Sequence, residues 1–292
     1  MPVSLKNGVI QAEIARDQGR SIITSLRQRT PLRASSPLYP ADFQTVCFYI
    51  MNSAAGLLQG DQHTISVRIK PGAHAVVLGQ GATKVFRSPK NALSRQFTTL
   101  IVEHGARLEY MPEVVIPFAE SCFFSRTNLL LSNNASAFLW EITAPGRAAR
   151  QELFAYTFLD QKTNIYLDRE LIYSDRFLLE PHKTPDYLQT WSKPLGFMHG
   201  YSHMGTFWAV DPRLEVEMAA LLRRNTEEEN CYIEKIAKDN SVLMAGTALC
   251  SQAYCFRALG HSAEDIQNAF KELWRILRLR LYQEPEWPWR KY

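Results

Sequence analysis

The sequence lacks several features that mark common protein classes. Its five cysteines are scattered along 292 residues without a C-x-x-C pair, so neither a disulfide framework nor a thiolate metal site is expected. No apolar run approaches the ~18 residues of a membrane-spanning helix, and the N-terminus lacks the charged and then apolar layout of a secretion signal. We therefore expect a cytoplasmic protein with reduced cysteines and no membrane contact.

A large surplus of charge is also missing. The chain has 33 basic and 29 acidic residues, a formal net charge of +4, and no arginine-rich or RNP-like motif, so nucleic acid is not an expected partner. The hydrophobic fraction of 46% and the charged fraction of 21% are ordinary for a globular protein. The chain is long enough to bury a full core, and we expect one domain over residues 1–292.

Familiar catalytic motifs are absent as well. The sequence contains no G-x-S-x-G and no H-E-x-x-H segment. The segment Gly79-Gln80-Gly81-Ala82-Thr83-Lys84 is rich in glycine and carries a lysine, but it leads into the extended stretch 85–89 rather than into a helix. A phosphate-binding loop requires a helix at that point, so we interpret this segment as a tight bend between two strands.

What the sequence does contain is a recurring β pattern. Ile65, Val67 and Ile69 alternate with polar residues, which predicts a half-buried strand that follows the small-residue bend at 52–61. The stretches VRIKPGAHAVV, LIVEHGARLEY and LLLSNNASAFL each read as strand, tight turn and strand, with turns at Gly72, Gly105 and Asn134, at intervals of 33 and 29 residues. This period predicts stacked β-strand units that form a solenoid-like or sandwich-like body.

Helices are expected only near the C-terminus. Asp211-Pro212 is a helix-start signal for a helix over about 212–225, and Ser262 with Asp265 begins an apolar stripe that predicts a helix over about 262–282. The β body is expected over about 20–210 and 242–260. It includes strands at 153–158, 164–173 and 176–179, with polar joins at 160–162 and 174–175. The fold class is mainly β with a small C-terminal α-helical part.

Two histidines suggest a metal site. His199 and His203 stand four residues apart, which on a helix would place both imidazoles on one face. Glycines at 196, 200 and 205 disfavour a helix there, so a loop that carries two histidines is the alternative.

Acidic residues within or beside apolar strands are the other candidates for chemistry. They are Asp61, Glu141, Glu152, Asp168 and Glu170. They could be structural charges with Arg147 and Arg169 as counter-ions. Alternatively, Asp61 and Glu141 could be the paired carboxylates of a β-solenoid carbohydrate-active enzyme.

A set of short motifs in a fixed order gives the chain a family resemblance. The motifs are Gln28-Arg29-Thr30-Pro31-Leu32-Arg33, Gly56…Gly60-Asp61, Ala82-Thr83-Lys84, Gly105-Ala106…Tyr110-Met111-Pro112, Trp140-Glu141-Ile142…Gly146-Arg147 and Arg257-Ala258-Leu259-Gly260. In this order the chain resembles the UreD family of urease accessory proteins, also called UreH, over nearly its whole length. It departs from the family pattern at Ala54-Ala55, where a Pro-Gly-Gly type run is usual.

The resemblance implies a scaffold rather than an enzyme. Such a protein binds apo-urease and, with the accessory protein UreF and the GTPase UreG, supports delivery of nickel through an internal tunnel. Nickel would then be cargo, with no tightly bound cofactor. Asp61, Glu141, Thr83, Lys84 and Arg147 are the tunnel or interface residues that the resemblance implies. The C-terminal tail with Trp287 and Trp289 is expected either to form a docking contact or to fold back on the body.

Overall fold

Two β-sheets form the body of the molecule. The computed structural model describes residues 7–39, 44–181, 198–215 and 232–284. Sheet A contains, in spatial order, β14 (Glu170–Leu179), β13 (Phe158–Leu167), β11 (Cys122–Leu131), β8 (Ser94–Val102), β5 (Gln62–Ile69), β1 (Asn7–Asp17) and β2 (Arg20–Arg29). Sheet B contains β16 (Leu243–Cys250), β17 (Ala253–Gly260), β15 (His203–Val210), β12 (Ser136–Thr143), β9 (Arg107–Met111), β6 (His74–Gln80), β4 (Val46–Asn52) and β3 (Leu32–Ala34).

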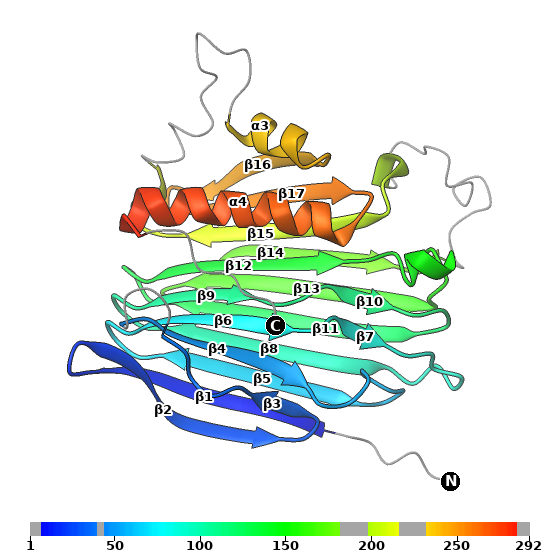
Figure 1. The fold of residues 1–292 in the computed structure, drawn as a ribbon, viewed down its shortest axis with the longest axis horizontal. Coiled ribbons are helices and arrows are strands. Elements are labelled where there is room, and N and C mark those ends of the chain that lie inside the picture. Colours follow the sequence, from blue (N-terminus) through cyan, green and yellow to red (C-terminus); the bar gives the residue numbers. More distant parts are fainter. Residues whose placement is uncertain (1–6, 40–43, 182–197, 216–231, 285–292) are drawn as a thin grey trace.

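The chain winds from one sheet to the other in stacked coils (Figure 1). Three of the turns from sheet A to sheet B contain one residue with positive φ, namely Gly72 at 68°, Gly105 at 65° and Asn134 at 68°. The strands on either side of each turn pair in parallel with the equivalent strands of the next coil. The short strands β7 (Thr83–Val85) and β10 (Val115–Pro117) belong to sheet B beside this order of strands, and β10 pairs in parallel with both β7 and β12. The predicted stack of β units is confirmed.

Some boundaries differ from the prediction. The β body begins at Asn7 rather than near residue 20. The expected joins at 160–162 and 174–175 are wrong, because both segments lie inside a hairpin of β13 and β14 that turns at Asp168-Arg169. The strand expected at 153–158 is also wrong, since β13 begins only at Phe158. The sequence alone indicated loops at these polar segments, because the partners that their side chains bind inside the fold cannot be seen in it.

The helices lie on the outer face of sheet B. The C-terminal helix α4 (Ala263–Tyr282) matches the prediction, and Ser262 Oγ accepts a hydrogen bond from the Asp265 amide at 3.0 Å. Its apolar stripe packs on the outward residues of β12, β15 and β17. The short helix α3 (Tyr232–Asp239) was not expected. The helix expected at 212–225 falls largely outside the described residues, although residues 214–215 are helical.

A charged cluster fastens α4 to sheet B. Glu109 on β9 is fully buried, and it accepts hydrogen bonds from Trp274 Nε1 at 2.5 Å and from Arg278 Nη1 at 2.6 Å. Arg107 adds an ion pair with Glu109 at 3.4 Å. The carboxylate of Glu284 accepts hydrogen bonds from both Arg107 and Arg278. Because every charge in this cluster faces an opposite charge, the helix can be held by polar groups in a dry interface.

Candidate functional site

The space between the two sheets is half apolar and half polar. Strand register aligns the inward residues of sheet A into rows across β5, β8, β11 and β13. Toward the C-terminal ends of these strands one row is apolar, formed by Val67, Leu100, Leu129 and Ile165. Toward their N-terminal ends the next two rows are largely polar, formed by Ile65, Thr98, Thr127 and Thr163 and by His63, Gln96, Ser125 and Gln161.

Glu141 reaches this polar region from sheet B. It lies on β12, and its carboxylate accepts hydrogen bonds from Thr127 Oγ1 at 2.7 Å and from Thr163 Oγ1 at 3.1 Å. Burial raises the pKa of Glu141, the two hydroxyl donors oppose that rise, and the nearby charge of Asp175 adds to it. The carboxyl group therefore keeps its proton to a higher pH than an exposed glutamate does.

Further polar contacts extend the region along the stack of coils. Tyr110 on β9 is hydrogen-bonded to Thr98, and burial raises the pKa of Tyr110, which keeps the phenol neutral. In the direction of β13, Thr143 Oγ1 donates to Gln161 Oε1 at 2.7 Å. We call the inward polar residues of both sheets the polar seam, namely His63, Gln96, Thr98, Tyr110, Ser125, Thr127, Glu141, Thr143, Gln161, Thr163 and Asp175.

Two small cavities lie along the polar seam. One, lined by Glu141, Thr163, Asp175 and Thr206 among others, has about 20 Å³ open to the centre of a water molecule, which is room for roughly one water. The other, near the N-terminal coils, has about 50 Å³ and is lined by His63, Gln96, Tyr110 and Thr83 among others. Tyr110 links the second cavity to the threonine row, so the seam runs from one cavity to the other.

His63 contributes an imidazole side chain to the polar seam. Its residue is 2% exposed, and burial lowers its pKa to about 4 despite the neighbouring charge of Asp61. Within the described residues, Nε2 of His63 has no hydrogen-bond partner. A neutral imidazole with an unpaired ring nitrogen beside a cavity is suited to bind a metal ion transiently.

An ion pair borders the seam at the β14 edge. Asp175 Oδ2 lies 2.8 Å from Arg257 Nη2, and Arg257 also donates to the hydroxyl of Tyr173 at 3.2 Å. Just over half of the Arg257 side chain is exposed. The seam therefore approaches the surface between β14 and β17.

Comparison with known proteins shows which family the chain belongs to. The family described as UreD urease accessory protein matches residues 6–291. The chain belongs to the UreD family. A urease accessory protein UreD of Bacillus cereus is 26% identical over 285 residues, 98% of each chain. UreD of Halalkalibacterium halodurans is 31% identical over 210 residues, 72% of this chain and 75% of the relative. UreD of Sporosarcina pasteurii is 31% identical over 199 residues, 67% and 75% respectively.

The UreD family is named for an accessory rather than a catalytic role.

In the described residues, no helix has the length and apolar character needed to cross a membrane. Four cysteines within those residues, Cys47, Cys122, Cys250 and Cys255, are free thiols.

The residues carried over from the UreD resemblance occupy different places. Glu141 lies in the seam, and Thr83 lines its N-terminal cavity. Asp61 is 2% exposed and accepts from the Leu58 amide at 3.1 Å, which closes the bend before β5 beside His63. Lys84 is exposed, and its carbonyl oxygen accepts from the Leu57 amide. Asp61 and Glu141 make separate contacts and share neither cavity, so they do not form a carboxylate pair.

The contacts of the Arg147 side chain lie in a loop and not in the polar seam. Its guanidinium binds both carboxylate oxygens of Glu152 and lies 4.4 Å from the centroid of the Phe118 ring. This contact lowers the pKa of Glu152. Arg147 was anticipated as a counter-ion, and that interpretation is confirmed for Glu152.

The two histidines do not share a helix face. His203 begins strand β15, is 6% exposed, and lies with Nδ1 2.9 Å from Ser202 Oγ. Burial lowers the pKa of His203. His199 lies in the 3-10 turn Met198–Gly200, and its side chain is outside the description. The described part of the chain holds no group of three His, Cys, Asp or Glu residues placed to bind a metal ion.

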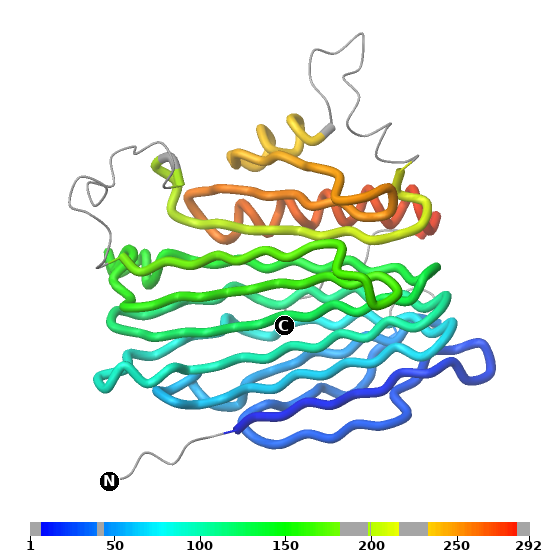
Figure 2. Tube along the Cα trace, turned by 180° about the vertical axis from the view of Figure 1, so that it is seen from behind, coloured from blue at the N-terminus to red at the C-terminus, as the bar shows by residue number. Residues whose placement is uncertain are grey.

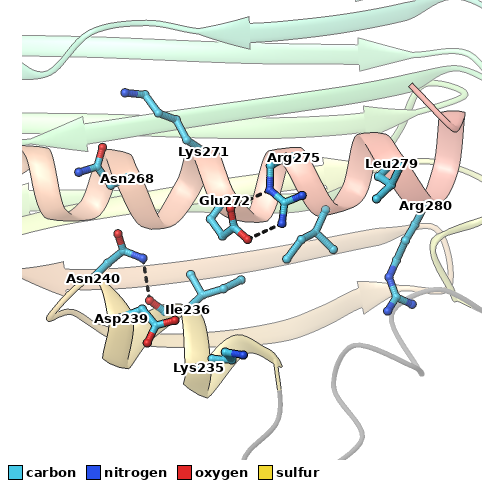
Figure 3. A pocket seen from close by; sticks show the side chains of 11 residues that line it. Lys235, Ile236, Asp239, Asn240, Asn268, Lys271, Glu272, Arg275, Leu279 and Arg280 are labelled. Carbon is cyan, nitrogen blue, oxygen red and sulfur yellow. Dashed lines mark hydrogen bonds and ion pairs between the residues drawn. The ribbon is translucent and has the colours of Figure 1, made fainter. Parts of the chain in front are cut away.

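A larger cavity lies away from the seam, between α3 and α4 (Figure 3). It is an open groove of about 570 Å³ with Ile236 and Leu279 among its apolar residues. Arg275 donates to both oxygens of Glu272 across its wall, at 2.7 and 2.8 Å. Its exposed, mixed charges are typical of a solvated surface groove rather than a reaction site.

Proposed function

We propose that this chain supports urease maturation by holding the urease apoprotein together with UreF-type and UreG-type accessory proteins while nickel passes along the polar seam. The observation that carries this proposal is the seam itself. Four threonines, two glutamines, a serine, a glutamate, an aspartate, a tyrosine and a histidine line the space between the two sheets, beside rows of apolar inward residues.

Such a seam would be a poor choice for stability alone. Apolar side chains at these positions would bury surface without the desolvation penalty of polar groups. The adjacent rows of the same strands show that the fold accommodates Leu, Ile and Val there. A function in the interior accounts for the polar residues better than packing does.

The chemistry of the seam suits a moving divalent cation. Hydroxyl, carboxylate and amide oxygens and one imidazole are spread over several strands, so each offers nickel a weak and temporary site. A closed set of four to six ligands would instead hold the ion. Nickel is therefore the substrate of the delivery process, and we expect the chain to hold no tightly bound cofactor.

Glu141 is the charged group best placed to assist passage. Its raised pKa means that a proton can occupy the carboxylate between ions, and an arriving cation would displace that proton. Thr127 and Thr163 hold the carboxylate in one orientation through both exchanges.

The experiment that tests this function measures nickel in urease. Cells that produce urease and its accessory proteins but lack this chain should accumulate nickel-poor urease, and the wild-type chain should restore nickel content and activity. The Glu141→Leu variant should restore less than a tenth of the wild-type nickel per urease. Glu103→Gln, which removes a surface charge paired with Arg68, is the matched control and should restore it fully. Full activation of urease without the chain would refute the proposal.

A further inference from the structure

The two sheets differ in what covers their outer faces. Helix α4 packs on the outer face of sheet B. Figure 2 looks onto the outer face of sheet A, and no other described element crosses it. Strands β1, β5, β8, β11 and β13 of this sheet run parallel. Parallel sheets are usually covered on both faces, so a bare parallel face is a site where a partner is expected.

One row of this outer face is apolar. Register aligns Ile101, Leu130, Tyr166 and Leu171 across β8, β11, β13 and β14. Leu130 is 36% exposed and Leu171 is 50% exposed. A continuous apolar strip across four strands, rather than scattered single residues, is typical of an interaction surface.

The next row is a rigid polar ladder. Asn164 Nδ2 donates to Asn128 Oδ1 at 2.9 Å, and Ser174 Oγ donates to Asn164 Oδ1 at 2.9 Å. These cross-strand bonds fix the side chains of three neighbouring strands. The face is therefore preorganised, which lowers the entropy lost when a partner binds.

The third row is basic. Phe97, Arg126, Lys162 and Arg176 align across β8, β11, β13 and β14. Arg176 pairs with Asp160 at 2.8 Å. Among the described residues no carboxylate pairs with Arg126 or Lys162, and Arg126 lies over the ring of Phe124 at 5.4 Å. Two adjacent cations thus face outward beside aromatic rings, without acids to neutralise them.

We propose that the outer face of sheet A docks a folded protein that presents carboxylates opposite Arg126 and Lys162 and apolar side chains opposite Leu130 and Leu171. This rests on the proposed function for the partners that are tested, and it adds a docking surface on the face of these strands opposite the seam. The three rows cross four strands over about five residues, which is roughly 19 by 17 Å or about 320 Å². Each partner buries roughly 800 Å² in a stable protein complex, so these rows would form the centre of the contact and the partner would also cover neighbouring parts of the sheet.

The composition of the face favours a protein over a nucleic acid. A phosphate backbone would need cations along its whole path, whereas here one row is neutral and one is apolar. Arginine and aromatic residues beside exposed leucines, with few acids, are typical of protein interfaces.

A charge reversal tests the proposal. The full-length chain, immobilised through a terminal tag, would be titrated with purified urease apoprotein and, separately, with the purified UreF-type protein of the same organism. Arg126→Glu with Lys162→Glu should weaken the binding of at least one probe tenfold or more, and raising the salt concentration should weaken wild-type binding to that probe. The control pair Arg33→Glu with Lys235→Glu has the same charge change at exposed sites outside sheet A and should bind as the wild type does.

A second variant separates docking from simple charge attraction. Leu130→Asn with Leu171→Asn keeps the charge and should weaken the same probe, while circular dichroism and thermal melting report that the sheets are intact. Unchanged binding of both probes to the charge-reversed variant would overturn the proposal. So would equal losses in the control pair, or binding of a single-stranded RNA oligonucleotide in competition with the protein probe. A wild-type chain that binds neither probe would overturn the proposed function together with this surface, whereas the other outcomes overturn the surface alone.

Discussion

At the scale of single residues, Glu141 combines a cost in stability with the role in nickel passage that we propose for it. Its folded-state pKa is raised above the unfolded value. Its contribution to stability is therefore fully present below the unfolded pKa and is lost as pH rises toward the folded pKa. The carboxyl group is held in the seam by two hydroxyl groups rather than by a cation.

The Glu141→Gln variant tests this residue directly. We expect it to be more stable than the wild type by about 1–2 kcal/mol at pH 8, since an amide keeps hydrogen bonds without the buried charge. At pH 4 the two proteins should be nearly equal, because the wild-type carboxyl is then protonated. Denaturant unfolding at both pH values measures the difference. A variant that is less stable at pH 8 would show that the carboxylate is not penalised by its surroundings.

Glu141 was predictable from the sequence, but most of its companions were not. An acid inside an apolar strand is conspicuous, whereas threonine is ordinary in any strand. Only the register between strands aligns Thr98, Thr127 and Thr163. His63 could have been found, because the alternation that placed Ile65 and Val67 inward places His63 on the same face.

At the scale of elements, the repeat of strand, turn and strand depends on the tight turns that join the two sheets. Gly105 has φ of +65°, and a Cβ built there meets no atom within 4 Å. Gly105→Ala should therefore cost only backbone strain, about 1–2 kcal/mol. At Gly79 an added Cβ would lie 2.5 Å from the Glu113 amide nitrogen. Gly79→Ala should cost more than Gly105→Ala in urea unfolding, and the reverse order would contradict this account of the coil.

The attachment of α4 to sheet B makes a second prediction at this scale. Glu109→Ala leaves Arg278 and Arg107 without their central carboxylate in a buried interface, so we expect a loss of about 3–5 kcal/mol. Glu272→Ala removes an exposed pair with Arg275 and should cost less than ~1 kcal/mol. Thermal melting of the two variants provides the comparison. Similar losses for both would show that the buried cluster does not fasten the helix.

Element types were predicted best where a local signal was strong. The cap at Ser262 and the apolar stripe located α4, and the turn residues located the coils. The β13–β14 hairpin was misplaced because Asp160 and Gln161, polar residues in mid-strand, have partners on other strands that no local pattern reveals.

At the scale of the whole molecule, we propose that sheet A docks a partner on its outer face and lines the path of nickel on its inner face. Adjacent residues on β11 illustrate this, since Arg126 points outward and Thr127 points into the seam. The two-residue period of a strand allows docking and transport to be changed separately. We expect the charge-reversed Arg126 and Lys162 variant to lose partner binding, and a seam variant to retain binding while losing nickel transfer.

The most direct test of the central claim measures nickel transfer through an assembled complex whose seam has lost the two hydroxyl groups that bind Glu141. In Thr127→Val with Thr163→Val, the volume is nearly kept and both donors to Glu141 are removed. The control Thr24→Val with Thr247→Val changes the same residue type at exposed positions. With complex assembly verified by size-exclusion chromatography, we predict at least a tenfold lower rate of nickel incorporation into urease for the seam variant and an unchanged rate for the control. An unchanged rate in the seam variant would contradict the account.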